Sequence, residues 1–170
     1  MCLTIAVWRN DFGSFVTTRQ SAAADVRQPM FSFFKREKFE PEFPIIDLKS
    51  TPDEVFSKLS AVSSVERTED SDEKDIDYAF VVENDVTRIH VGFVNDRVSY
   101  VNYLTEQFNG SEKKKAEKLN WFLAYYGSKE EYGEPNNTGY MIFFHNTKRD
   151  LSIVYGLHMG PIRVNNHANV

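Results

Sequence analysis

Four histidines carry most of the potential for metal or acid–base chemistry in this sequence: His90, His145, His158 and His167. We expect His90 and His145 to project from one face of a β-sheet. There they could bind a divalent ion together with Glu83, because imidazole and carboxylate suit several such ions. However, no two histidines stand two or four residues apart, and no HExxH motif occurs. The sequence therefore predicts surface histidines and no metal site.

Motifs for nucleophilic catalysis and for phosphate binding are missing. The chain holds no GxSxG, GxxxxGK[S/T] or GxGxxG sequence. The single cysteine, Cys2, has no second cysteine with which to form a disulfide or a zinc cage. Most carboxylates lie in polar segments, where contact with water makes them poor acids and bases at neutral pH. We therefore expect no catalytic residue and no cofactor, and we favour a binding protein over an enzyme.

The length and composition of the chain predict one folded domain. The chain has 170 residues, of which 41% are hydrophobic and 26% charged, with a net charge of −5. This balance excludes a fully disordered chain and gives no general attraction to nucleic acid or anionic membranes. A basic cluster at 113–118 is better explained as a solvated helix face than as a phosphate site, because a helix N-terminus disfavours cations. No apolar run reaches the roughly 18 residues that cross a bilayer, and we expect a cytoplasmic protein.

The N-terminal part divides into two segments. Residues 1–29 show no helix or strand period and are expected to be a disordered or spurious extension. Met30–Arg36 resembles the opening of many bacterial proteins, and the apolar run 2–8 lacks the basic start of a secretory signal. Residues 30–50 form an aromatic-rich arm in which Pro41 and Pro44 disfavour a regular helix.

Two helices are predicted behind this arm. Thr51, Pro52 and Glu54 form a capping box with proline at the first helical position, and an apolar stripe extends the helix over 52–62. Ser111 can cap a second helix, and Gly127 can end it. The acidic segment 64–75 between the first helix and the next elements is expected to be a loop, with a short strand near its start.

The residue patterns of the remaining segments predict antiparallel strands joined by short turns. Asn84-Asp85 and Asn95-Asp96 favour two-residue hairpin loops, because both residue types tolerate a positive φ. The expected strands are Asp77–Glu83, Thr87–Val94, Val98–Leu104, Tyr140–His145, Asp150–Tyr155 and Ile162–Val164. The predicted fold class is α+β, with two helices packed on one face of an antiparallel meander.

The two halves of the domain look alike. Residues 78–84 align with 140–146, and both helices carry matching apolar positions. The domain at 51–164 is therefore a candidate tandem repeat with halves 51–104 and 111–164, followed by a tail at 165–170. Alternation assigns these side chains to the core face: Tyr78, Phe80, Ile89, Val91, Phe93, Tyr140, Ile142, Phe144, Leu151, Ile153 and Tyr155.

The opposite, outer sheet face supplies the candidate binding residues. It is polar in the first half but carries Met141, Phe143 and Val154 beside His145 in the second half. Such an apolar cluster predicts an interface with a protein partner or with a second copy of the chain. The alternative explanation is that the phenylalanine arm covers it.

A second hypothesis places a small-molecule site on the same outer face. It would use Arg88, His90 and Tyr103 in a pocket between the sheet and the arm. This hypothesis rests only on ionisable groups that are expected to share one face of the sheet.

The predicted order of elements over about residues 50–157 resembles that of type III secretion chaperones. These are small acidic α+β proteins that commonly dimerise and bind partner segments. The tandem layout is also similar to β-lactamase inhibitor protein-like domains. Both resemblances imply a protein-binding role by topology alone. The third helix of the chaperones has no counterpart here, because Pro161 and a polar tail occupy its place.

Overall fold

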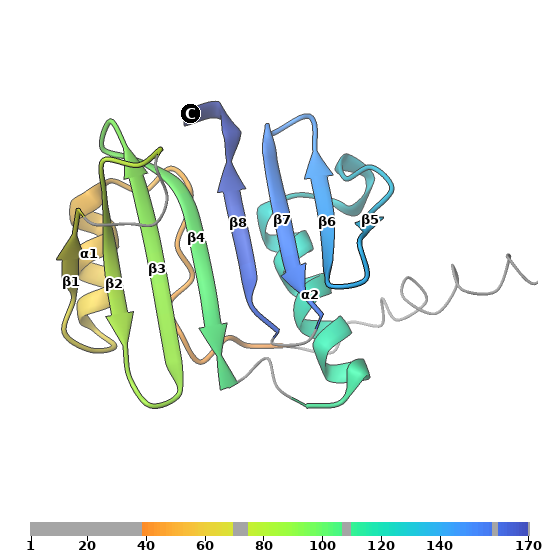
Figure 1. Cartoon of the computed structure of the whole chain (residues 1–170), viewed down its shortest axis with the longest axis horizontal. Helices are drawn as coiled ribbons and strands as arrows, with labels where there is room; N and C mark the ends of the chain where they lie inside the picture. The colour runs from red at the N-terminus through yellow and green to blue at the C-terminus, as the bar shows by residue number, and fades with distance from the viewer. Residues whose placement is uncertain (1–38, 70–74, 107–109, 158–159, 170) are drawn as a thin grey trace, which may run out of the picture. The chain divides into compact units, whose positions relative to one another are not determined.

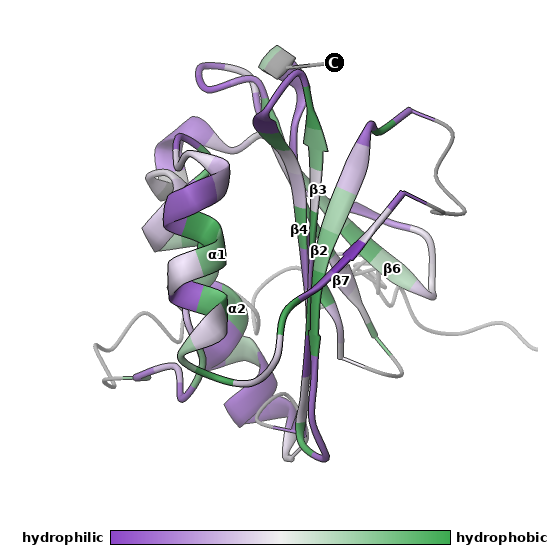
Figure 2. Cartoon of the chain, turned by 90° about the vertical axis from the view of Figure 1, so that its left-hand side faces the viewer, coloured by the Kyte–Doolittle hydropathy of each residue, from purple (hydrophilic) through white to green (hydrophobic). Residues whose placement is uncertain are grey.

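The computed structural model describes residues 39–69, 75–106, 110–157 and 160–169. They form one eight-stranded antiparallel sheet with both α-helices on the same face (Figures 1 and 2). This confirms the predicted α+β class. The helical elements are α1 (Pro52–Ser60), α2 (Glu112–Tyr126), η2 (Lys129–Glu131) and η3 (His167–Asn169).

The strand order across the sheet is β1-β2-β3-β4-β8-β7-β6-β5. Each half of the chain thus contributes one α-helix followed by four strands, and the halves meet where β4 pairs with β8. The duplication suggested by the sequence stays a prediction. The strands are β1 (Glu66–Thr68), β2 (Tyr78–Glu83), β3 (Thr87–Val94), β4 (Arg97–Thr105), β5 (Asn136–Asn137), β6 (Met141–Asn146), β7 (Leu151–Gly156) and β8 (Ile162–Asn166).

The helix ends follow the sequence signals closely. The Thr51 hydroxyl accepts a hydrogen bond from the Glu54 amide, and the Glu54 carboxylate accepts one from the Thr51 amide, which completes the capping box of α1. The helix ends at Ser60, two residues before the predicted end. Ser111 caps α2, and Gly127 follows its last residue.

Gly127 ends α2 without the left-handed conformation typical of a C-terminal glycine. Its φ is −173°, which any residue adopts. A glycine is needed there for space, since a Cβ at this position would lie 2.5 Å from the Asn146 amide nitrogen.

The two Asn-Asp turns differ from each other. Asn95 and Asp96 both have positive φ values, 50° and 57°, as the hairpin prediction requires. The connection after β2 instead spans three residues. There the Asn84 side-chain oxygen accepts hydrogen bonds from the amides of Val86 and Thr87.

The core lies between the sheet and the two helices. Every residue predicted for the core face is buried except Tyr140, which is 73% exposed. This prediction is wrong because β6 begins one residue later, at Met141, after Gly139 turns the chain with a φ of 87°. Burial of one large apolar side chain, such as Phe122 on α2, stabilises the fold by about 2–3 kcal/mol.

The described part of the arm packs on the helix side of the sheet. Phe43 is buried against Tyr103 of β4 and Phe122 of α2, and Phe39 packs edge-on against Trp121. The suggestion that the arm covers the outer face is therefore wrong for residues 39–50. Phe31, Phe33 and Phe34 lie outside the described residues.

Candidate functional site

The outer face of the sheet carries a contiguous group of apolar side chains at one end of β4, β8, β7 and β6. We call this group the outer apolar patch; its members are Leu104, Met141, Phe143, Val154 and Pro161. Met141 is 46% exposed, and Phe143 and Leu104 are each 36% exposed. Val154 and Pro161 are partly exposed.

Strand alternation produces the patch on β6 and β7. Burial alternates along β6, so Met141 and Phe143 point outward while Ile142 and Phe144 enter the core. Phe143 lies directly opposite Val154 of β7 in the sheet register. Directly opposed residues on one face are close enough for their side chains to pack.

The segment that leads into β8 completes the patch. A Cβ placed on Gly156 would lie 2.8 Å from Cδ of Pro161, so the proline ring lies over this glycine. The β4–β8 register ends at the pair Tyr103 and Ile162. Extending it by one residue brings Leu104 level with Pro161, and Gly156, which pairs with Met141, is the next residue in the same row. Leu104 and Met141 thus lie at the two ends of this row, three strand spacings or roughly 14 Å apart, with the Pro161 ring between them.

A polar and aromatic band borders the patch on β3, β4 and β8. The Tyr100 ring lies over Gly92 so closely that a Cβ at this position would overlap Cε1 of the ring. The Arg163 guanidinium carbon stands 4.0 Å from the centre of this ring, and the Tyr100 hydroxyl lies 3.3 Å from Nε2 of His90. These contacts hold Tyr100 flat against the sheet.

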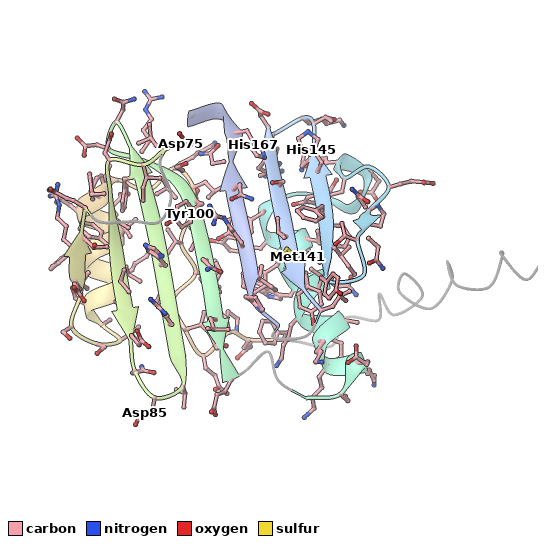
Figure 3. The ribbon with its side chains drawn as sticks, in the orientation of Figure 1. Asp75, Asp85, Tyr100, Met141, His145 and His167 are labelled. Carbon is pink, nitrogen blue, oxygen red and sulfur yellow. The ribbon has the colours of Figure 1, made fainter. Side chains whose placement is uncertain are left out.

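The band continues across β8 and β7 to the histidines of the second half. The Asn165 side chain accepts a hydrogen bond from Nε of Arg163 and donates one to the Ser152 hydroxyl. The same hydroxyl lies 2.9 Å from Nε2 of His167, whose ring centre is 5.9 Å from that of His145. Figure 3 shows Met141 near the start of β6 and both histidines near its other end.

The predicted polar residues of the first half lie apart from this histidine pair. Arg88 forms an exposed ion pair with Glu83 at 3.5 Å, and His90 contacts Tyr100. Four strand spacings of about 4.8 Å, roughly 19 Å in all, separate His90 on β3 from His145 on β6. These two histidines cannot share a metal ion with Glu83.

Tyr103 does not join Arg88 and His90, contrary to the second hypothesis. It is fully buried on the core face, where its oxygen accepts a hydrogen bond from the Ile46 amide and lies 3.0 Å from the Tyr126 oxygen. Burial raises the pKa of this phenol far above its ordinary value. The proposed trio is thus divided between the two faces of the sheet.

Two further observations concern metals and membranes. Among the residues that the structure describes, no three His, Cys, Asp or Glu side chains gather in a way that could hold a metal ion. In the same residues, no helix is long and apolar enough to cross a bilayer.

Sequence reasoning found three of the five patch residues and missed Leu104 and Pro161. The signal for Leu104 is present, since it alternates with buried neighbours on β4. Pro161 precedes the predicted strand Ile162–Val164, and it joins the patch where the connection between β7 and β8 brings its ring over Gly156. No protein-family model, no curated protein and no solved structure matches this chain.

Proposed function

We propose that this protein is a non-enzymatic binding module that pairs with a second copy of itself through the outer apolar patch. The observation that carries the proposal is the exposure of Met141 and Phe143 on β6, and of Leu104 on β4, on the sheet face that neither described α-helix covers (Figure 2). Contiguous exposed apolar side chains bordered by polar groups are typical of protein interfaces. A cytoplasmic location stays a prediction from the sequence.

The choice of a second copy as the partner follows from the charge of the patch. In a two-fold symmetric pair, residues near the axis lie opposite their own counterparts. A charged residue there would meet a like charge, whereas apolar side chains are complementary to themselves. All five patch residues are uncharged, so a two-fold axis can pass through the patch without repulsion.

The polar band supplies the rim of such an interface. Ser152, Asn165 and Arg163 are partly exposed and already hydrogen-bonded to one another or to neighbours. Polar groups that are paired before association lose little hydration when a partner approaches. Side chains that are already held by hydrogen bonds also lose little conformational entropy on binding.

Sedimentation velocity of the full chain over a wide concentration range tests the proposal. We expect a concentration-dependent dimer for the wild type and a monomer for Phe143→Asp, because the variant places two carboxylates near the symmetry axis. The matched control is Val86→Asp, which alters an apolar residue that is 52% exposed and lies outside the patch. A wild type that is monomeric at every concentration, or a Val86→Asp variant that also dissociates, would contradict the proposal.

A further inference from the structure

A cavity of about 1010 Å³ lies at the end of the sheet where the β3–β4 and β6–β7 turns meet the end of α2 and the loop 47–51. It is separate from the outer apolar patch, with which it shares no lining residue. Its size is at the upper end of the range found for small-molecule sites. Six of its lining residues matter for the inference: Asp47, Lys49, Asp96, Arg97, Tyr125 and Arg149.

The lining of the cavity carries charges of both signs. Three cationic side chains face two carboxylates, and each carboxylate already accepts a hydrogen bond. Asp47 accepts from the backbone amide of Lys49 at 2.9 Å, and Asp96 accepts from the Tyr78 hydroxyl at 2.7 Å.

The three cationic side chains differ in whether a carboxylate already forms an ion pair with them. Arg149 pairs with Glu131 at 2.8 Å. Within the part of the chain that the structure describes, Lys49 and Arg97 form no ion pair with a carboxylate. These two groups are therefore available to an anionic ligand, and hydrogen bonds that involve a charged partner are about twice as strong as neutral ones.

One aromatic side chain gives the cavity an apolar wall. The Tyr125 ring is 45% exposed and stacks on Trp121, with ring centres 5.1 Å apart and an angle of 18° between the planes. This stacking fixes the ring orientation and leaves ring surface for a planar ligand. Burial, followed by the charge of Asp47, raises the pKa of the Tyr125 phenol, so its hydroxyl stays a donor at neutral pH.

We infer that this cavity binds a small organic anion that carries a planar ring. The anionic group would contact Arg97 and Lys49, and the ring would pack against Tyr125. The inference is independent of the proposed self-association, because it uses the opposite, helix-bearing side of the sheet at its end. It assigns a ligand class, an aromatic carboxylate, sulfonate or phosphate, to a feature that no sequence motif marks.

Fluorescence titration of the full chain with 8-anilinonaphthalene-1-sulfonate tests the inference, since this probe combines a sulfonate with planar rings. We expect saturable single-site binding by the wild type. Arg97→Gln and Lys49→Gln should each weaken binding by about ten-fold, which is typical of losing one charged hydrogen bond. Circular dichroism should show that both variants remain folded. Because two separate variants are measured, a local folding defect in one of them cannot by itself explain the result.

Two matched controls make the outcome decisive. Arg88→Gln removes the same charge from the outer face, where Arg88 pairs with Glu83, and should leave probe binding unchanged. Phe143→Asp should also leave it unchanged, although it disrupts the proposed dimer. The inference is overturned if the wild type does not bind the probe saturably or if Arg88→Gln weakens binding as much as Arg97→Gln. It is equally overturned if Phe143→Asp abolishes binding, which would place the probe on the outer apolar patch.

Discussion

Ile46 of the arm, Tyr103 of β4 and Tyr126 of α2 form a closed ring of buried hydrogen bonds. The Ile46 amide donates to the Tyr103 oxygen at 2.9 Å, and the Tyr126 hydroxyl donates to the Ile46 carbonyl at 2.6 Å. Because the Tyr126 proton is used in this way, the Tyr103 hydroxyl donates to the Tyr126 oxygen at 3.0 Å. We call this arrangement the tyrosine ring network, and we predict that Tyr126→Phe destabilises the protein strongly.

The expected cost follows from the groups that the substitution leaves behind. Tyr126→Phe removes the donor to the Ile46 carbonyl and the acceptor of the Tyr103 hydroxyl. Ile46 and Tyr103 are both 0% exposed, so water cannot replace either bond. Each buried group left without a partner costs about 1–3 kcal/mol. For the two groups together, we therefore expect the free energy of unfolding to fall by about 2–6 kcal/mol.

Urea denaturation followed by tryptophan fluorescence measures this loss. Tyr125→Phe is the matched control. The Tyr125 hydroxyl makes no hydrogen bond to a described residue, and the Tyr125 side chain is 45% exposed. We expect that control to change stability by less than about 0.5 kcal/mol. The double variant Tyr103→Phe/Tyr126→Phe should cost less than the sum of the single variants, since the two residues share a bond. A loss below about 0.5 kcal/mol for Tyr126→Phe would refute the reasoning.

Three further outcomes are expected. Burial raises the pKa of both phenols in the tyrosine ring network above 10.0, so their stabilisation is fully present below pH 10 and is lost at higher pH. The contribution of these two phenols to the free energy of unfolding should therefore fall by about 1.4 kcal/mol per pH unit near pH 10 and by about 2.7 kcal/mol per pH unit from about pH 11, measured by urea denaturation at several pH values. Gly92→Ala should cost about 1–3 kcal/mol because its Cβ must displace the Tyr100 ring, whereas Gly133→Ala, whose Cβ would meet nothing within 4 Å, should be nearly neutral in thermal melts. Thr51→Ala should cost about 1 kcal/mol in urea denaturation by removing the N-cap of α1.

Local chemistry explains which elements could be predicted. The capping box at Thr51 and Glu54 depends only on residues within one helical turn. The Asn95-Asp96 turn depends on two residues that tolerate positive φ. Alternation along β6 placed Met141 and Phe143 on the outer face because adjacent strand residues point in opposite directions.

The features that escaped prediction depend on contacts between distant segments. The pairing of β4 with β8 joins residues about sixty positions apart, and it places Leu104 next to the segment that leads into β8. Phe43 is apolar enough to pack on either face, and only the space between the sheet and α2 selects the helix side. The cavity lining comes from five segments of the chain, so no single motif could reveal it.

The proposed pairing joins two copies of the chain through the outer apolar patch. Its most direct test is an isotope-filtered NOE experiment on a mixture of chains, one sample labelled with ¹³C at the methionine methyl groups and the other unlabelled. We predict NOEs from the labelled Met141 methyl group to aromatic protons of Phe143 in the unlabelled chain, lost on Phe143→Asp. Intermolecular NOEs confined to other surfaces, or none at concentrations where sedimentation detects a dimer, would contradict the account.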